Sequence, residues 1–271
     1  NCFNMLYLVL SILFSSSLFI IFKFFDIYKV NTLQAIIINY IVAFIVGIFS
    51  YESSFSFIEI PQKSWFIGAL ILSALFITVF NLMALTSQRN GVSVASVAGK
   101  MSIIIPVAFG VYLYKEHLDI IKIIGIALAL PAVYLTATKE KSGAASNNLL
   151  LPILLFLGSG IIDTTIKYVQ NTYVPIKELP IFSATIFGFA AVLGGATFFV
   201  KRTPLNIKNI IAGIVLGIPN YYSIIFLLKA LDSDHIPSGV IFTINNVAIV
   251  MLTSLLGMML FKEKMMLKNI I

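Results

Sequence analysis

The chain has 271 residues, of which 59% are hydrophobic and 11% are charged, and its 18 basic and 11 acidic side chains give a net charge of +7. A soluble domain needs about 25% charged residues to cover its surface, so this composition excludes a soluble globular protein and indicates a membrane protein. The excess of positive charge is expected in short loops, and it does not indicate nucleic acid as a partner. The single cysteine, Cys2, offers no disulfide or metal cluster.

Nine apolar runs are long enough to cross a hydrocarbon core of about 30 Å, which takes roughly 20 helical residues. In chain order they are Met5–Phe22, Val30–Tyr51, Ser64–Gln88, Asn90–Tyr114, Ile120–Thr138, Leu149–Val169, Leu179–Val200, Asn209–Leu228 and Ile236–Phe261. A tenth run would begin near Met266. Because the chain starts at Asn1 and stops where this run begins, we expect the sequence to be cut at both ends.

The turn after the fourth run returns near the end of the chain. Leu113 to Leu118 (LYKEHL) is echoed by Leu260 to Met265 (LFKEKM), 147 residues later. The polar segment Lys139 to Asn148 is the expected junction. The chain is therefore predicted to contain two repeats, residues 1–141 with five spans and residues 149–271 with four spans and the start of a fifth. Two tandem repeats with an odd number of spans must insert in opposite orientations, which is an inverted repeat.

The repeated hairpin has a proline in its first helix (Pro106), a Lys-Glu turn ending at Glu116 and a glycine opening the next helix (Gly125). In these features the chain resembles the EamA family of the drug/metabolite transporter superfamily. The resemblance implies an all-α integral membrane bundle of about ten helices in two inverted five-helix repeats, with both termini cytoplasmic. It also implies export or exchange of small metabolites across the plasma membrane. The chain departs from this pattern at Thr253, which aligns with Pro106, and in the missing tenth helix.

Two charged residues lie at mid-membrane depth. Lys100 is about nine residues into the fourth run and Asp163 about fourteen into the sixth, a difference in depth of about 8 Å. A charge at the bilayer centre costs about 2.5–3.5 kcal/mol on insertion scales, and such residues usually face a cavity or a partner. We expect Lys100 and Asp163 to line a substrate cavity, with Asp163 as a candidate proton carrier. The alternatives are an ion pair that locks two helices, a Lys100 that snorkels to one surface, or Lys167 as the partner of Asp163.

Neutral polar residues extend the candidate site. Pro219 in the eighth run removes a backbone donor and is expected to interrupt the helix beside Asn220, Tyr221 and Tyr222, which would form a cavity wall or a kink filled by neighbouring helices. Further candidates to bind substrate, or simply to bridge helices, are Asn245 and Asn246 in the ninth run and Asn81 in the third. Small residues such as Gly213 and Gly217 are expected to pack helices together.

The predicted function is a secondary transporter that moves an amino acid, a drug-like or a nucleobase-like solute by alternating access. The alternatives are a channel or lipid scramblase, or a non-transporting sensor subunit. An enzyme is disfavoured because His117 and His235 lie at loop edges and the sequence contains no HExxH motif and no G-x-S-x-G nucleophile elbow. No cofactor is expected beyond proton coupling. The expected partners are a small-molecule substrate, the lipid bilayer and a second copy of the chain in a homodimer.

Two arguments disagree on membrane orientation. Eleven basic residues fall in the loops on the side opposite the N-terminus, against six on its own side. The positive-inside rule therefore places the N-terminus outside. The family resemblance places it in the cytoplasm.

Overall fold

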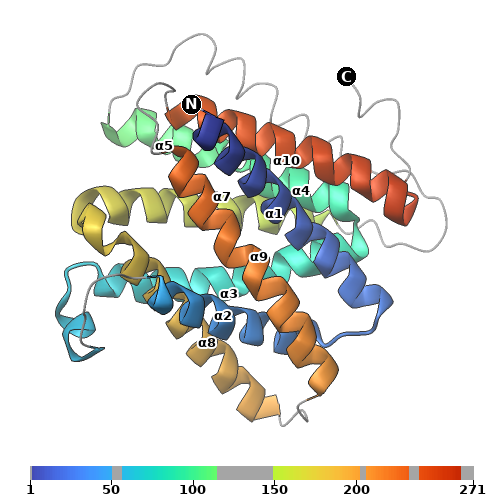
Figure 1. The fold of residues 1–271 in the computed structure, drawn as a ribbon, viewed down its shortest axis with the longest axis horizontal. Helices are drawn as coiled ribbons and strands as arrows, with labels where there is room; N and C mark the ends of the chain where they lie inside the picture. The colour runs from blue at the N-terminus through green and yellow to red at the C-terminus, as the bar shows by residue number, and fades with distance from the viewer. Residues whose placement is uncertain (1, 51–56, 115–148, 202–205, 232–237, 264–271) are drawn as a thin grey trace.

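The chain folds into a bundle of helices (Figure 1). The computed structural model describes residues 2–50, 57–114, 149–201, 206–231 and 238–263, and these residues contain no strand. The helices are α1 (Cys2–Ile27), α2 (Thr32–Phe49), η1 (Phe57–Gln62), α3 (Phe66–Arg89), α4 (Val92–Met101), α5 (Ile104–Tyr114), α7 (Leu150–Tyr173), η2 (Ile176–Glu178), α8 (Leu179–Lys201), α9 (Ile207–Leu231) and α10 (Ser238–Phe261).

Within the described residues, eight segments are long and apolar enough to cross a membrane, with α4 and α5 counted as one. They correspond to the first four predicted runs and to the sixth through the ninth. The prediction of an all-helical, multi-pass membrane protein is therefore confirmed. The predicted fifth and tenth runs, the junction and the first Lys-Glu turn lie outside the described residues.

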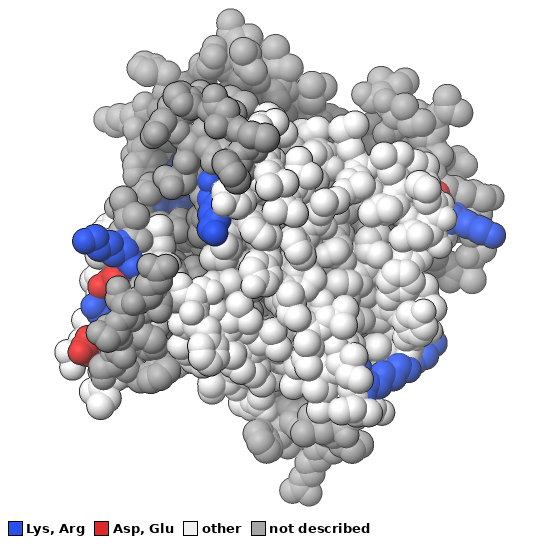
Figure 2. Space-filling model, viewed as in Figure 1, with Lys and Arg blue, Asp and Glu red and all other residues white. Residues whose placement is uncertain are grey.

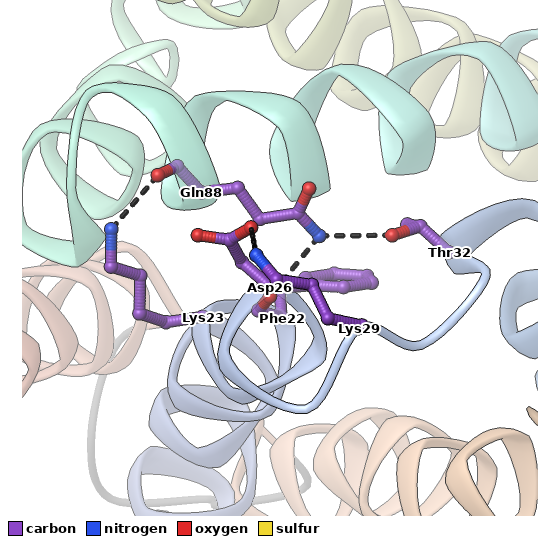
Figure 3. Close-up of polar contacts among 6 residues, drawn as sticks. All are labelled: Phe22, Lys23, Asp26, Lys29, Thr32 and Gln88. Carbon is purple, nitrogen blue, oxygen red and sulfur yellow. Dashed lines mark hydrogen bonds and ion pairs between the residues drawn. The ribbon is translucent and has the colours of Figure 1, made fainter. Parts of the chain in front are cut away.

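A polar corner joins the ends of α1 and α3 to the start of α2 (Figure 3). The Lys23 ammonium donates to the backbone carbonyl of Gln88 at 2.8 Å, near the C-terminus of α3, where a cation is favoured by the helix dipole. The Gln88 side chain donates in return to the Phe22 carbonyl at 3.2 Å and to the Thr32 hydroxyl at 2.9 Å. Three helix ends are thus tied together, and the Lys23 ammonium satisfies a carbonyl left open at the end of α3.

The fourth span is broken, whereas the eighth is not. The helix stops at Met101 and restarts at Ile104. Pro106 has no N–H to donate to the Ser102 carbonyl, which instead accepts from the Ile105 N–H at 2.9 Å. By contrast α9 continues through Pro219. The predicted interruption of the eighth run is therefore wrong, because proline removes only one donor and the helix is supported on that stretch by its packing on α2.

The helices of the first part of the chain, α1 to α5, are interleaved with those of the second part, α7 to α10. The helix α1 packs on α9 and α10, while α7 packs on α3 and α4; likewise α2 packs on α9, while α8 packs on α3. In addition α2 packs on α8, and α4 packs on α10. The most extensive contacts of every one of these helices cross between the two parts, so the parts form one bundle around shared cores.

The closest of these contacts is between α2 and α9, where glycines and amides alternate. A Cβ on Gly213 would lie 2.7 Å from the Ala35 carbonyl oxygen, and one on Gly217 would lie 3.0 Å from that of Asn39. Beside them, the Asn209 amide donates to the Gln34 side chain at 2.5 Å. The prediction that Gly213 and Gly217 pack helices together is confirmed, because only a glycine lets the backbones approach this closely.

The outer surface is suited to lipid. Figure 2 shows a face whose middle is free of charged side chains, with Lys, Arg, Asp and Glu at its margins. Large apolar side chains are exposed on several helices, including Phe49, Ile67, Val192, Ile207 and Met259. An exposed apolar surface of this extent would be unstable in water and is expected of a protein that contacts acyl chains.

Candidate functional site

Lys100 and Asp163 are brought together at the contact between the fourth span and α7. Lys100 is the penultimate residue of α4, just before the break at Ser102, and Gly99 lies against the Ser159 hydroxyl, one helical turn before Asp163. The charges of Lys100 and Asp163 attract each other. The Asp163 carboxylate is thus within electrostatic reach of the Lys100 ammonium.

The two residues do not form a tight ion pair. Direct ion pairs between described residues are Lys29 with Asp26 and Lys63 with Glu178, so Lys100 and Asp163 interact across a gap wider than a direct contact. Lys100 is half-buried and Asp163 is exposed. A pair that only locked two helices would be buried and in contact. This arrangement instead leaves both charged groups able to take a third partner.

An apolar core lies beside this pair. Six helices contribute to the neighbouring core, which includes Phe19 of α1, Val79 of α3, Ala98 of α4, Ile104 of α5, Ile162 of α7 and Ile249 of α10. In a medium of low dielectric, charges interact more strongly than in water, and an unpaired charge is costly. A solute with groups of both signs could therefore be bound here by the ammonium and the carboxylate together.

A chain of buried polar groups crosses four helices elsewhere in the bundle. The Asn220 amide donates to the Asn39 side chain at 3.1 Å, and the Ser223 hydroxyl donates to the Asn220 carbonyl at 2.8 Å. The Ser11 hydroxyl lies 3.0 Å from the Ser223 carbonyl oxygen and 3.2 Å from the Asn245 side-chain oxygen. These contacts join α2, α9, α1 and α10. Asn220 and Asn245 therefore bridge helices, which for Asn245 is the second of the two roles that the sequence left open.

The remaining predicted residues are dispersed. Tyr221 is buried against Gly47 of α2, whereas Tyr222 is exposed and stands in a row of aromatic rings with Phe14 and Phe226. Asn81 donates to the Ile77 carbonyl of its own helix at 2.7 Å. Asn246 is half-buried. These four residues are not gathered around Lys100 and Asp163 by any contact between described side chains.

Sequence reasoning missed Asn39, Ser11 and Ser223 in the polar chain, and it missed the role of Glu178. A single hydroxyl or amide within an apolar helix gives no signal until its partner is known. Among the described residues there is also no cluster of His, Cys, Asp and Glu that could hold a metal ion.

Glu178 forms a cluster at the end of the bundle where α3 and α8 begin. Its carboxylate accepts from the Lys63 ammonium at 2.8 Å and from the Trp65 indole at 2.7 Å. Trp65 is 1% exposed and packs edge to face on Phe182 of α8. The hydrogen bonds from Lys63 and Trp65 hold the pKa of Glu178 below its ordinary value of 4.5. The carboxylate form of Glu178 thus ties the start of α3 to the start of α8.

We expect the stability conferred by Glu178 to depend on pH. A carboxyl group whose pKa is lowered by folding contributes stability above its unfolded-state pKa, and this contribution is lost as the pH falls through the folded-state pKa. The melting temperature in detergent should therefore be higher for the wild type than for Glu178→Gln at about pH 7, and the two should converge as the pH falls through the lowered pKa of Glu178. Glu59→Gln, which changes an exposed carboxylate on the neighbouring η1, is the control and should not alter the melting temperature at pH 7. A gap between wild type and Glu178→Gln that stayed constant with pH would contradict this account.

Comparison with known sequences relates this chain to a protein family and to a protein of Haemophilus influenzae. The sequence profile of the EamA-like transporter family matches residues 3–138, about half of the chain. A protein of Haemophilus influenzae, described only as uncharacterized, is 29% identical over 267 residues, which cover 95% of this chain and 90% of the relative. Of these two matches, only the family profile has a description that names a function.

Proposed function

This chain belongs to the EamA-like transporter family of the drug/metabolite transporter superfamily, and from that membership we propose that it carries a small organic solute across the plasma membrane by alternating access. Members of the family are membrane transporters and not enzymes. The proposed solute is an amino acid or a drug-like or nucleobase-like compound, moved by export or exchange, with proton coupling through Asp163.

The observation that carries the proposal is the pair of opposite charges beside the apolar core of the bundle. Lys100 and Asp163 attract each other without direct contact, at a break in the fourth span. A charged residue inside the membrane is expensive and is retained where it serves a pathway. We propose that a zwitterionic or polar solute binds between them, with its anionic group toward Lys100 and its donor groups toward Asp163.

We further propose that the chain is an inverted repeat of two five-helix units. The family match covers residues 3–138, close to the first expected repeat. The packing supports the same arrangement, because exchanging the two units turns the α1–α9 contact into the α7–α3 contact, and the α2–α9 contact into the α8–α3 contact. Pairs of equivalent helices, α2 with α8 and α4 with α10, pack on each other, as a two-fold axis between the units requires.

The interleaved packing bears on which elements would move. Rocking one sequence repeat as a block would separate α1 from α9 and α2 from α9, where glycines and buried amides hold the backbones together. We therefore propose that α4, α5 and α10 rearrange around a more rigid group of helices. The break between α4 and α5 supplies a place for such a change.

Counterflow in liposomes tests the function. The purified chain is reconstituted and loaded with one unlabelled amino acid or nucleobase at a time, and uptake of the labelled solute is followed. A carrier gives uptake that saturates with concentration and is stimulated by solute on the opposite side. Flux that does not saturate would favour a channel or scramblase, and the absence of exchange for every solute would favour a sensor subunit.

A further inference from the structure

The helices α4 and α10 meet at one end of the bundle, where α4 begins and α10 ends. Glu263, just beyond the end of α10, places its carboxylate on the first residues of α4. One oxygen accepts from the Val92 N–H at 2.8 Å, and the other accepts from the Ser93 N–H at 3.3 Å and the Ser93 hydroxyl at 3.0 Å. The first N–H groups of a helix have no partner within it, and the dipole there favours an anion. This is a charged contact between residues 170 or more positions apart.

The backbone on both sides is shaped to receive the carboxylate. A Cβ on Gly91 would lie 2.7 Å from one Glu263 oxygen, and a Cβ on Gly257 would lie 2.9 Å from the other. Gly91 also has a φ of 107°, a backbone conformation that residues other than glycine rarely adopt. Lys262 adopts a φ of 52°, and the Glu263 N–H then bonds back to the Gly257 carbonyl at 3.2 Å. Neither glycine can be replaced without displacing the carboxylate.

A second contact lies about one turn deeper. The Thr253 hydroxyl lies 2.7 Å from the Ser96 hydroxyl, and both residues are fully buried. The contact of α10 with the fourth span is made with α4, while α5, beyond the break, packs on α7. The fourth span and α10 are thus held together at the end that Glu263 occupies, and the Lys100 and Asp163 pair lies beyond Ser96 along the fourth span.

We propose that Glu263 is a latch that holds α4 against α10 at this end of the bundle, and that its release from Val92 and Ser93 lets the two helices separate there. The role of the latch in transport rests on the proposed function. The closure itself needs no solute, so it can be measured independently. We name the contact of Glu263 with Val92 and Ser93 the Glu263 latch.

Cysteine labelling tests the latch. The reporter is Ser96→Cys, placed behind the latch in a Cys2→Ser background, since Cys2 is the chain's own cysteine. A membrane-impermeant maleimide is added from either side of oriented vesicles. Glu263→Gln should raise the labelling rate from the latch end by about tenfold, because a hydrogen bond to a charged group is replaced by weaker neutral ones. Labelling from the other end should not increase.

Two further variants make the result specific. Gly257→Ala keeps the carboxylate but places a methyl group against it, and it should also accelerate labelling from the latch end. If Glu263→Gln does not fold, the labelling rate of Gly257→Ala tests the latch in its place. Asp26→Asn removes an exposed carboxylate from the last turn of α1, near the same end, and should leave the rate unchanged. An unchanged rate in a folded Glu263→Gln protein would overturn the latch.

The outcome can be separated from that of the counterflow assay. Faster labelling in Glu263→Gln with no exchange of any solute would support the latch and contradict the transport function. Saturable exchange with no change in labelling would support transport and overturn the latch.

Discussion

Asp163→Asn is expected to lower the rate of saturable counterflow by about 10- to 100-fold and to remove its dependence on pH. A hydrogen bond to a charged group is worth about 1.5–3 kcal/mol, and each 1.4 kcal/mol lost from the transition state of a transport step lowers its rate about tenfold. Asparagine has nearly the shape of aspartate, but it carries no charge for Lys100 or a solute to meet and it does not take up a proton. The assay is the counterflow measurement, repeated across a range of pH.

The control for this prediction lies on the same helix. Thr164 is the next residue of α7, and its hydroxyl donates to the Gly160 carbonyl of its own helix at 2.7 Å. Thr164→Val removes a polar group of similar size at the same depth, and it should leave counterflow within about twofold of the wild type, since it takes no charge from the site. Counterflow in Asp163→Asn equal to that of Thr164→Val would move the binding site away from Asp163.

A double-variant comparison shows whether Lys100 and Asp163 act as a unit. If one solute bridges both, Lys100→Ala alone should lose nearly as much activity as Lys100→Ala combined with Asp163→Asn, because the first change already removes the bridge. Losses that multiplied in the double variant would mean that the two residues act on separate steps.

The central pair could be predicted from the sequence because its signal is local. A charge inside an apolar run is conspicuous, and counting residues from each end of the run gives its depth. The same logic placed Gly213 and Gly217 at a helix contact, since small residues spaced by four form one face. Both inferences need the position of a residue in its own helix, and neither needs the identity of the neighbouring helix beforehand.

The features that escaped prediction depend on partners far apart in the chain. Glu263 was visible in the sequence as part of a repeated turn, but its function as a cap depends on Val92, which only the packing of α4 on α10 brings near. Asn39 and Ser11 likewise gain meaning from Asn220 and Asn245. The interruption predicted at Pro219 was wrong for the same reason. A proline removes one backbone donor, but whether the helix breaks depends on the helix packed against it.

The close contact between α2 and α9, called the seam below, provides the prediction with the largest expected effect on stability. Gly213→Ala should destabilise the protein by about 1–3 kcal/mol, because an added Cβ would overlap Ile38 and approach the Ala35 carbonyl to 2.7 Å, and a close-packed seam relieves such overlap only by moving the helices apart. The shift would also strain the neighbouring bond between Asn209 and Gln34. The measurement is the thermal unfolding midpoint of the detergent-solubilised protein, which should fall by several degrees.

Gly195 of α8 is the matched control for this change. A Cβ on Gly195 would have no atom within 4 Å, so Gly195→Ala adds the same methyl group to a membrane helix without a clash. Its midpoint should stay within a degree or two of the wild type, because surface changes usually alter stability by no more than about 0.5 kcal/mol. Equal midpoints for the two alanine variants would mean that α2 and α9 can separate freely. In that case the seam could not belong to the rigid part of the bundle, and the proposal that α4, α5 and α10 move against it would lose its physical basis.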